Sequence, residues 1–279
     1  MRAHLLRRTF LALVTLAPGA AAAADYSYPD EVLRGTYGAE PVIADSVSWE
    51  GSYAGGFGAY SQANYGFGKA LRDTIAHEFR YLAVENEYHP SQWLTLKDTD
   101  HRNGGFGVFA GYNYQSEGIV LGFEADWTHT RLYGYSEDHI GRQVSLSNGL
   151  RDVVDLTGSA AAELKDYGTF RARLGYTAGN FLPFVTGGVA VGHATFTRSA
   201  GISLFEYKPD GTLSGQLTPP PFLKVKDAVV AGFAAGVGMD VAVTQNIFVR
   251  GEYQYAFFDS FDGYKFHVNT LRAAAGVRW

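Results

Sequence analysis

The stretch Gly118-Ile119-Val120-Leu121-Gly122-Phe123-Glu124-Ala125-Asp126-Trp127 alternates between two sets of residues. One set is apolar throughout and ends in Trp127, and the other contains Glu124 and Asp126. A period of two places the sets on opposite faces of a β-strand. A tilted strand needs about nine to eleven residues to cross the hydrocarbon core of a membrane. The stretch therefore predicts a membrane-spanning strand with one lipid-facing side and one charged side.

Seven further segments have the same alternation. Four of them are clear: 167–176, 228–241, 247–256 and 268–279. The other three are weaker and rich in glycine and aromatic residues: 51–61, 104–115 and 181–196. The connections alternate between tight turns, at 116–117, 178–180 and 244–246, and longer stretches, at 62–103, 130–165, 197–226 and 258–266. Short periplasmic turns and long extracellular loops are typical of bacterial outer-membrane barrels. The sequence thus predicts an all-β fold, an eight-stranded antiparallel transmembrane up-and-down β-barrel with long extracellular loops.

The N-terminus predicts export. Residues 1–24 combine early arginines, a short apolar run at 10–16 and alanines at 20–24, which is the pattern of a cleaved signal peptide. Arg7-Arg8 also resembles a twin-arginine signal, but a lipid-facing barrel cannot fold before it reaches its membrane, which favours the general secretory route. We therefore expect a signal peptide at 1–24, a periplasmic linker at 25–49 and a barrel domain at 50–279, located in the outer membrane.

Composition excludes several classes of function. The chain has no cysteine, which excludes disulfides and thiolate metal sites. Its net charge of −5 includes the basic signal peptide, so the mature chain is more acidic still. An acidic chain argues against nucleic acid as a partner. No later segment has an apolar run long enough for a transmembrane helix, so a membrane-spanning chain of this kind must form a closed barrel.

The predicted inward faces carry charged residues in five strands. These residues are Glu124, Asp126, Arg171, Arg173, Asp240, Arg250, Glu252, Arg272 and Arg278. Eight strands enclose a space just wide enough to be filled by side chains, and an unpaired buried charge costs several kcal/mol. We therefore predict a ladder of salt bridges across the lumen. It either fills and stiffens the barrel, which we favour, or acts as a selectivity gate for small ions.

A soluble lipid-binding barrel is an alternative, because such barrels also alternate, with the apolar face inward. The charged residues argue against it, since the lipid face of a membrane barrel excludes charge whereas a filled lumen accepts pairs.

Several stretches resemble a known family, the small porin-like outer-membrane barrels of alphaproteobacteria, often called outer-membrane immunogenic proteins. They include Phe170-Arg171-Ala172-Arg173-Leu174-Gly175-Tyr176, Leu182-Pro183-Phe184-Val185-Thr186-Gly187-Gly188 and the closing Leu271-Arg272-Ala273-Ala274-Ala275-Gly276-Val277-Arg278-Trp279. The resemblance implies eight strands, periplasmic termini and insertion by the barrel-assembly machinery. Family members more often end in Phe, and here Trp279 is the aromatic terminal residue of the assembly signal.

The stretch 62–103 predicts a folded segment rather than an irregular loop. Leu71, Ile75, Phe79 and Leu82 fit one apolar helix face, and strand-like residues follow at 80–84 and 93–96. The weak candidates for haem binding in this stretch are His77, His89, His101 and Tyr81. Their spacing does not place two histidines on one helix face, so we expect no cofactor and no metal.

An enzyme that modifies lipids is a further alternative, because His129 and His193 lie near predicted strand ends. No spacing joins them to a nucleophile, and a triad is defined by geometry. We therefore expect no enzyme. The sequence favours an integral outer-membrane protein with a structural, surface-exposed role and at most a narrow pore, surrounded by outer-membrane lipids and lipopolysaccharide. A surface receptor for haem or a host ligand is the alternative. The sequence names no oligomeric state.

Overall fold

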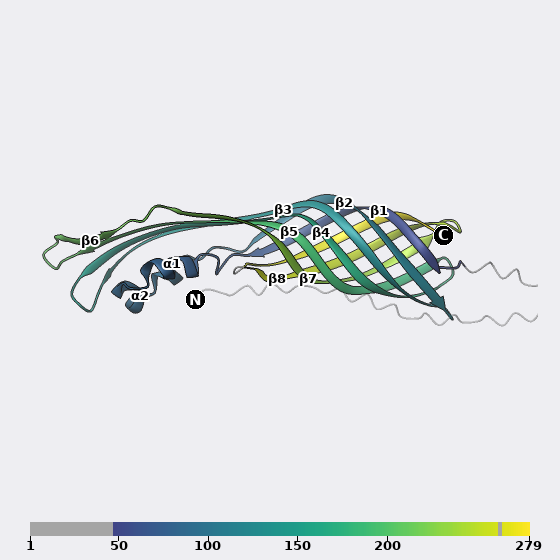
Figure 1. Ribbon diagram of the computed structural model, residues 1–279, viewed down its shortest axis with the longest axis horizontal. Helices are drawn as coiled ribbons and strands as arrows, with labels where there is room; N and C mark the ends of the chain where they lie inside the picture. The colour runs from purple at the N-terminus through teal and green to yellow at the C-terminus, as the bar shows by residue number, and fades with distance from the viewer. Residues whose placement is uncertain (1–46, 262–263) are drawn as a thin grey trace, which may run out of the picture. The chain divides into compact units, whose positions relative to one another are not determined.

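The computed structural model describes residues 47–261 and 264–279. Eight long strands of this part form one closed ring in the order β1–β2–β3–β4–β5–β7–β8–β9, with β9 paired to β1 and all neighbours antiparallel (Figure 1). The eight are β1 (Gly51–Gly66), β2 (Thr99–Ser116), β3 (Ile119–Ser145), β4 (Arg151–Tyr176), β5 (Phe181–Tyr207), β7 (Phe222–Ala242), β8 (Ile247–Phe261) and β9 (Tyr264–Arg278). A short ninth strand, β6 (Leu213–Leu217), pairs with the end of β5 outside the ring. This ring confirms the predicted eight-stranded antiparallel barrel. The predicted signal peptide and most of the predicted linker lie outside the described residues.

The two faces of the strands are as different as the sequence pattern requires. In β3 the alternate residues Ile119, Leu121 and Phe123 are exposed on the outside of the ring, whereas Glu124 and Asp126 are buried. Large apolar side chains exposed in this way on neighbouring strands form a continuous outer belt. Such a belt matches the apolar band of a membrane barrel.

Tight turns connect the strands at the end of the ring that also holds the C-terminus. Glu117 and Gly118 both have positive φ values, 46° and 86°, which is the geometry of a two-residue hairpin turn whose twist matches that of the strands. At the same end Ser52 and Trp279 exchange two backbone hydrogen bonds, at 3.1 and 3.0 Å, so the last residue joins the edge of β1.

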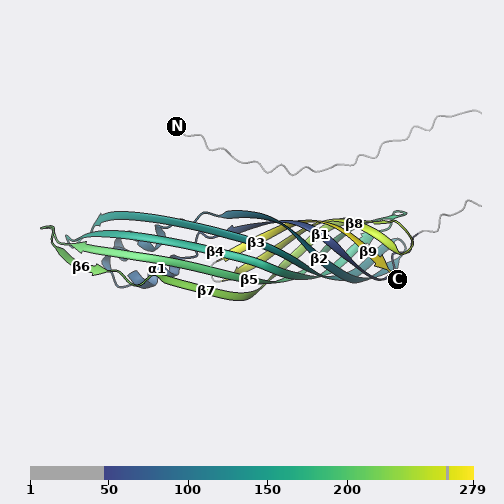
Figure 2. The same cartoon turned by 90° about the horizontal axis from the view of Figure 1, so that it is seen from above.

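At the opposite end the strands continue beyond the ring (Figures 1 and 2). The β3–β4 ladder reaches Ser145 and Arg151, and β5 extends to Tyr207 beside β6 and β7. We call residues 67–98, 132–164 and 194–228 the lobe. The stretches 130–165 and 197–226, predicted as connections between strands, are instead mostly strand, because most of their residues continue the sheet. Alternation persists there, but one face is polar and the other is covered by helices rather than lipid.

Short helices cover the apolar face of the lobe: α1 (Arg72–Phe79), α2 (Ala83–Tyr88) and the 3₁₀ turn η1 (Pro90–Gln92). Leu71, Ile75 and Phe79 are buried, as the helix pattern predicts. The strands predicted at 80–84 and 93–96 are wrong. α2 begins inside the first segment, and the second is irregular because its Leu94 and Leu96 pack into the same core without a partner strand.

Among the residues described, no helix is long and apolar enough to cross a membrane.

Gly158 of β4 allows the helical segment to lie close to the sheet. A Cβ atom there would lie 2.3 Å from Leu71 Cδ1 and 2.8 Å from Leu94 Cδ1. We expect Gly158→Val to destabilise the packing of residues 67–96 by about 1–3 kcal/mol, the usual effect of overpacking, while the barrel stays folded. Limited proteolysis should then cut residues 67–96 faster, with no change in heat-modifiable gel mobility. Gly104→Val is the matched control, because no atom lies within 4 Å of its added Cβ. Equal proteolysis of both variants would contradict the assignment.

Candidate functional site

The middle of the lumen holds a charge network that is balanced within itself. Four arginines and four carboxylates lie there on five strands, all of them buried: Arg171, Arg173, Arg250 and Arg272 with Glu124, Asp126, Asp240 and Glu252. These are eight of the residues that the strand pattern placed on inward faces. Equal numbers of opposite charges allow each ion to be paired without water.

Some pairs join neighbouring strands. Glu124 and Arg171 are cross-strand partners on β3 and β4, and their Oε1 and Nη2 atoms are 2.8 Å apart. Asp240 and Arg250 are partners on β7 and β8, with Oδ1 and Nε 2.7 Å apart. These contacts reinforce ladders that backbone hydrogen bonds already hold.

Other pairs cross the lumen and join opposite walls. Arg173 Nη2 on β4 donates to Asp240 Oδ2 on β7 at 2.5 Å, and Arg250 Nη1 on β8 donates to Glu124 Oε2 on β3 at 2.5 Å. Arg272 on β9 reaches Asp126 on β3 at 3.1 Å, and Arg171 also binds Glu252. The network therefore ties the β3–β4 wall to the β7–β8–β9 wall.

Hydroxyls and aromatic rings complete the network. The Tyr53 hydroxyl donates to Glu124 Oε2 at 2.9 Å, and Arg171 Nη1 donates to Thr186 Oγ1 at 2.7 Å. The guanidinium of Arg173 lies 3.9 Å from the ring centre of Phe184, a cation–π contact. The sequence reasoning missed these residues. Their inward position in the alternation was the available signal, but glycines blur it in 51–61 and 181–196.

Arg278 is not part of the network, contrary to the prediction. Its Nε donates to the Gln245 carbonyl at 2.8 Å, and its guanidinium lies 4.4 Å from the ring centre of Trp49. Arg278 is the last residue of β9 and lies at the turn end of the ring, where its described hydrogen bonds go to backbone carbonyls rather than to the central carboxylates. Trp279 is exposed next to it.

Apolar layers close the lumen on both sides of the network. On the turn side a cluster includes Trp49, Phe57, Phe109 and Phe248. On the lobe side the rings of Phe258 and Phe266 stack at 4.8 Å, next to Tyr65. The gap that remains among the network and lower-layer side chains has no volume for a water molecule. The described lumen is thus a packed core of apolar, ionic and apolar layers.

The four residues weighed for haem binding lie on different elements. His77 is in the last turn of α1, His89 follows α2 with a positive φ of 51°, and His101 is on β2, where its Nδ1 accepts the Tyr133 N–H at 3.4 Å. Tyr81 is exposed between the helices. In the part of the chain that the structure describes, no three His, Asp or Glu side chains form a group that could hold a metal ion.

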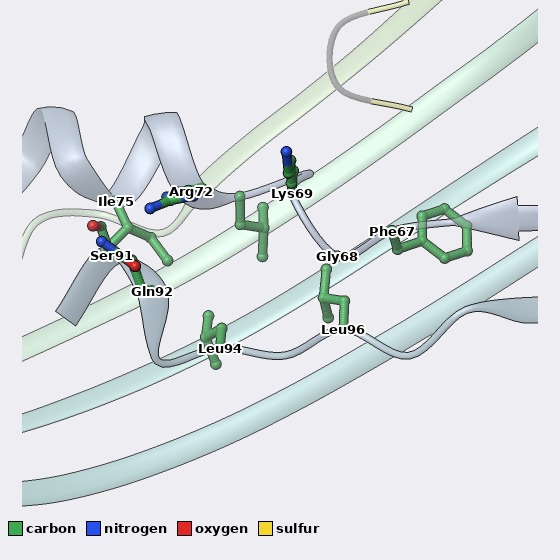
Figure 3. Close-up of a pocket in the computed structure, with 10 residues that line it drawn as sticks. Phe67, Gly68, Lys69, Arg72, Ile75, Ser91, Gln92, Leu94 and Leu96 are labelled. Carbon is green, nitrogen blue, oxygen red and sulfur yellow. The ribbon is translucent and has the colours of Figure 1, made fainter. Parts of the chain in front are cut away.

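The lobe contains a pocket of about 200 Å³ at the start of α1. Phe67, Ile75, Leu94 and Leu96 form its apolar wall, and Lys69 and Arg72 lie at its edge (Figure 3). Its lining includes no carboxylate.

Three carboxylates meet at another place in the lobe. Asp152 on β4 is the cross-strand partner of Glu206 on β5, and Glu87 of α2 accepts the N–H and hydroxyl of Ser147 at 3.0 and 2.7 Å. Burial of Asp152, together with repulsion from Glu206 and Glu87, raises its pKa to about 6. The lobe therefore holds an acid that titrates near neutral pH.

Comparison with known proteins identifies the family. Residues 9–278 match the family model described as outer membrane protein beta-barrel domain. The chain belongs to this family. A 31 kDa outer-membrane immunogenic protein of Brucella melitensis biotype 1 is 32% identical over 76% of this chain and 72% of its own length. A 22 kDa outer membrane protein of Rhizobium leguminosarum bv. viciae is 27% identical over 80% and 71%.

Among solved structures, the outer membrane protein OprG from Pseudomonas aeruginosa aligns with a TM-score of 0.35 and 12% identity, over 82% of this chain and 96% of that chain. A score this low adds nothing to the family match. The names of the two relatives state no enzymatic activity.

Membership of this family shows where the protein is located, and the positions of its turns show which end of the barrel faces outward. It is an integral protein of the outer membrane. Tight turns face the periplasm in barrels of this class, so the lobe lies on the extracellular side.

Removing one arginine should destabilise the barrel. Arg171 contacts Glu124, Asp126 and Glu252. We expect Arg171→Met to leave four buried carboxylates with only three arginines, and to cost about 3–5 kcal/mol because one buried negative charge is no longer balanced. The temperature at which the folded gel band converts to the unfolded band should fall. Adding Glu252→Gln should recover part of the loss, because it restores equal numbers of buried positive and negative charges. A double variant less stable than Arg171→Met would contradict the pairing.

The lobe should become more stable as the pH falls from 8 to 5. The folded lobe raises the pKa of Asp152 to about 6, whereas an unfolded aspartate has a pKa of about 3.9. Protonation therefore favours the folded lobe as the pH falls through about 6, and the gain is complete below about 4. The urea concentration at which protease cuts the lobe should be higher at pH 5 than at pH 8. Asp152→Asn should remove most of this difference, and a pH-independent wild type would refute the mechanism.

Proposed function

We propose that this protein is a sealed, non-catalytic outer-membrane barrel that reinforces the envelope and presents the lobe at the cell surface. The observation that carries the proposal is the layered lumen, in which the charge network lies between two apolar clusters. A pore needs a continuous wet path, and the central gap holds no water-sized volume. The ionic layer is thus a structural core rather than a selectivity gate.

Two observations support the absence of catalysis. The imidazole of His129 pairs with Asp166, but the side-chain contacts described for that pair include no serine or threonine hydroxyl. The buried carboxylates of the lumen are paired with arginines in a space without water. A reaction needs a substrate beside the reacting groups, and the gap beside Glu124 and Glu252 has no room for one.

The lobe supports the surface role. A helical segment packed onto extended strands gives it a hydrophobic core that continues into the lobe-side apolar layer of the barrel, so it presents fixed side chains outside the membrane. Surface recognition is then a property of an ordered structure. We further expect barrel-assembly machinery as the partner during insertion, with Trp279 as the terminal aromatic.

Planar-bilayer recording tests the proposal. We expect no discrete conductance steps from the purified protein, and none from Arg171→Ala, because the apolar layers remain when one member of the network is removed. Heat-modifiable mobility of both proteins is the control for folding. Stepwise ion conductance by the folded wild type would refute the sealed barrel, and steps seen only with Arg171→Ala would make the network a gate.

A further inference from the structure

A row of ionisable side chains crosses three strands on the outer surface of the barrel. His129 on β3 and His193 on β5 are both cross-strand partners of Asp166 on β4. The Nδ1 atom of His129 lies 2.7 Å from Asp166 Oδ1, and these two side chains are 38% and 37% exposed. His129 and Asp166 are therefore hydrogen-bonded to each other and still partly exposed, and His193 is exposed beside them.

Irregular pairing adjoins this row in two ladders. The register shifts between His129 and Leu132 on β3, and between Leu164 and Asp166 on β4. Bulges turn side chains away from the regular alternation and occur next to functional sites. Phe106, the partner of His129 on β2, and Trp127, two residues earlier on β3, have their rings 5.3 and 6.0 Å from the His129 ring.

The row lies at the extracellular boundary of the lipid-facing belt. The apolar outward residues of β3 begin with Ile119 at the periplasmic turn and end with Trp127, one outward position before His129. Ten residue steps of about 3.3 Å along a strand tilted by about 40° rise roughly 25 Å, the height of the apolar band of such barrels. The row is therefore at the level of the lipid headgroups in the outer leaflet.

A groove of about 220 Å³ adjoins the row on its membrane side. Gly168 forms its floor, because it is the cross-strand partner of Trp127 on one side and of Val191 on the other and has no side chain of its own. Val229 also lines the groove, and Asp166 and His193 lie at its extracellular end. The groove is thus apolar along its length and polar at the end nearest the headgroups.

The size and polarity of the groove and the row suit the binding of one lipid molecule from the outer leaflet. The groove, at about 220 Å³, is large enough to take a segment of an acyl chain. A carboxylate and two imidazoles accept and donate hydrogen bonds to the hydroxyl and amide groups at the base of an acyl chain of a glycolipid. We propose that the groove and the His129–Asp166–His193 row bind one molecule of lipopolysaccharide, with an acyl chain over Gly168.

Native mass spectrometry of the intact mature protein in a sugar-free detergent tests the site. The probes are purified rough lipopolysaccharide and, separately, phosphatidylethanolamine. We expect the wild type to retain one lipopolysaccharide with at least tenfold higher affinity than phosphatidylethanolamine. Gly168→Leu should lower that affinity at least tenfold by filling the groove, which its backbone accommodates with a small shift because the new Cβ meets only Asp126 O at 3.1 Å.

Gly251→Leu is the matched control. Gly251 is exposed on β8, which is not a neighbour of β3, β4 or β5, and no atom lies within 4 Å of its added Cβ. It should retain lipopolysaccharide like the wild type. Asp166→Ala leaves the groove open and should weaken binding severalfold, which provides a second test if Gly168→Leu loses heat-modifiable mobility. Equal retention by the wild type, Gly168→Leu and Asp166→Ala, or equal affinity for both lipids, would overturn the proposal.

Discussion

The pairing of buried charges is the constraint on which the rest of the structure depends. Eight strands leave no room for water around an arginine, so every guanidinium needs a carboxylate or a ring within reach. The four central arginines reach four carboxylates, and several of these contacts span the lumen. This requirement fixes which residues face inward. Because side chains alternate, it also fixes which apolar residues face the lipid.

The layers on either side of the network follow from the same limited space. Aromatic residues close the periplasmic end around Trp49, and stacked rings close the opposite end around Phe258 and Phe266. Above the second layer, β3, β4 and β5 continue as a sheet whose apolar face is covered by α1 and α2 instead of lipid. A barrel sealed in this way has its accessible chemistry on two surfaces, the extracellular lobe and the lipid-facing wall. The polar row beside Gly168 lies where these two surfaces meet.

The sequence by itself determined the barrel, its strand number and the inward position of the charged residues. Each of these follows from a period-two pattern that only a closed sheet can satisfy in lipid. It also indicated the helix face around Leu71, Ile75 and Phe79. It did not show that 130–165 and 197–226 are mostly strand, since residues outside the membrane can be polar whether they form a strand or a loop.

Tertiary structure alone decided which charges meet. Alternation places Arg278 on the same face as Arg171, but only the positions along the strands separate the end of β9 from the network. Likewise, the partner of Arg173 is on a strand two places away in the ring, and no local pattern specifies a contact that passes over the strand between them. His129, Asp166 and His193 are far apart in sequence, and the register of two ladders brings them into one row. Register depends on the packing of the whole ring, which is why the sequence determined the faces and only the fold decided the contacts.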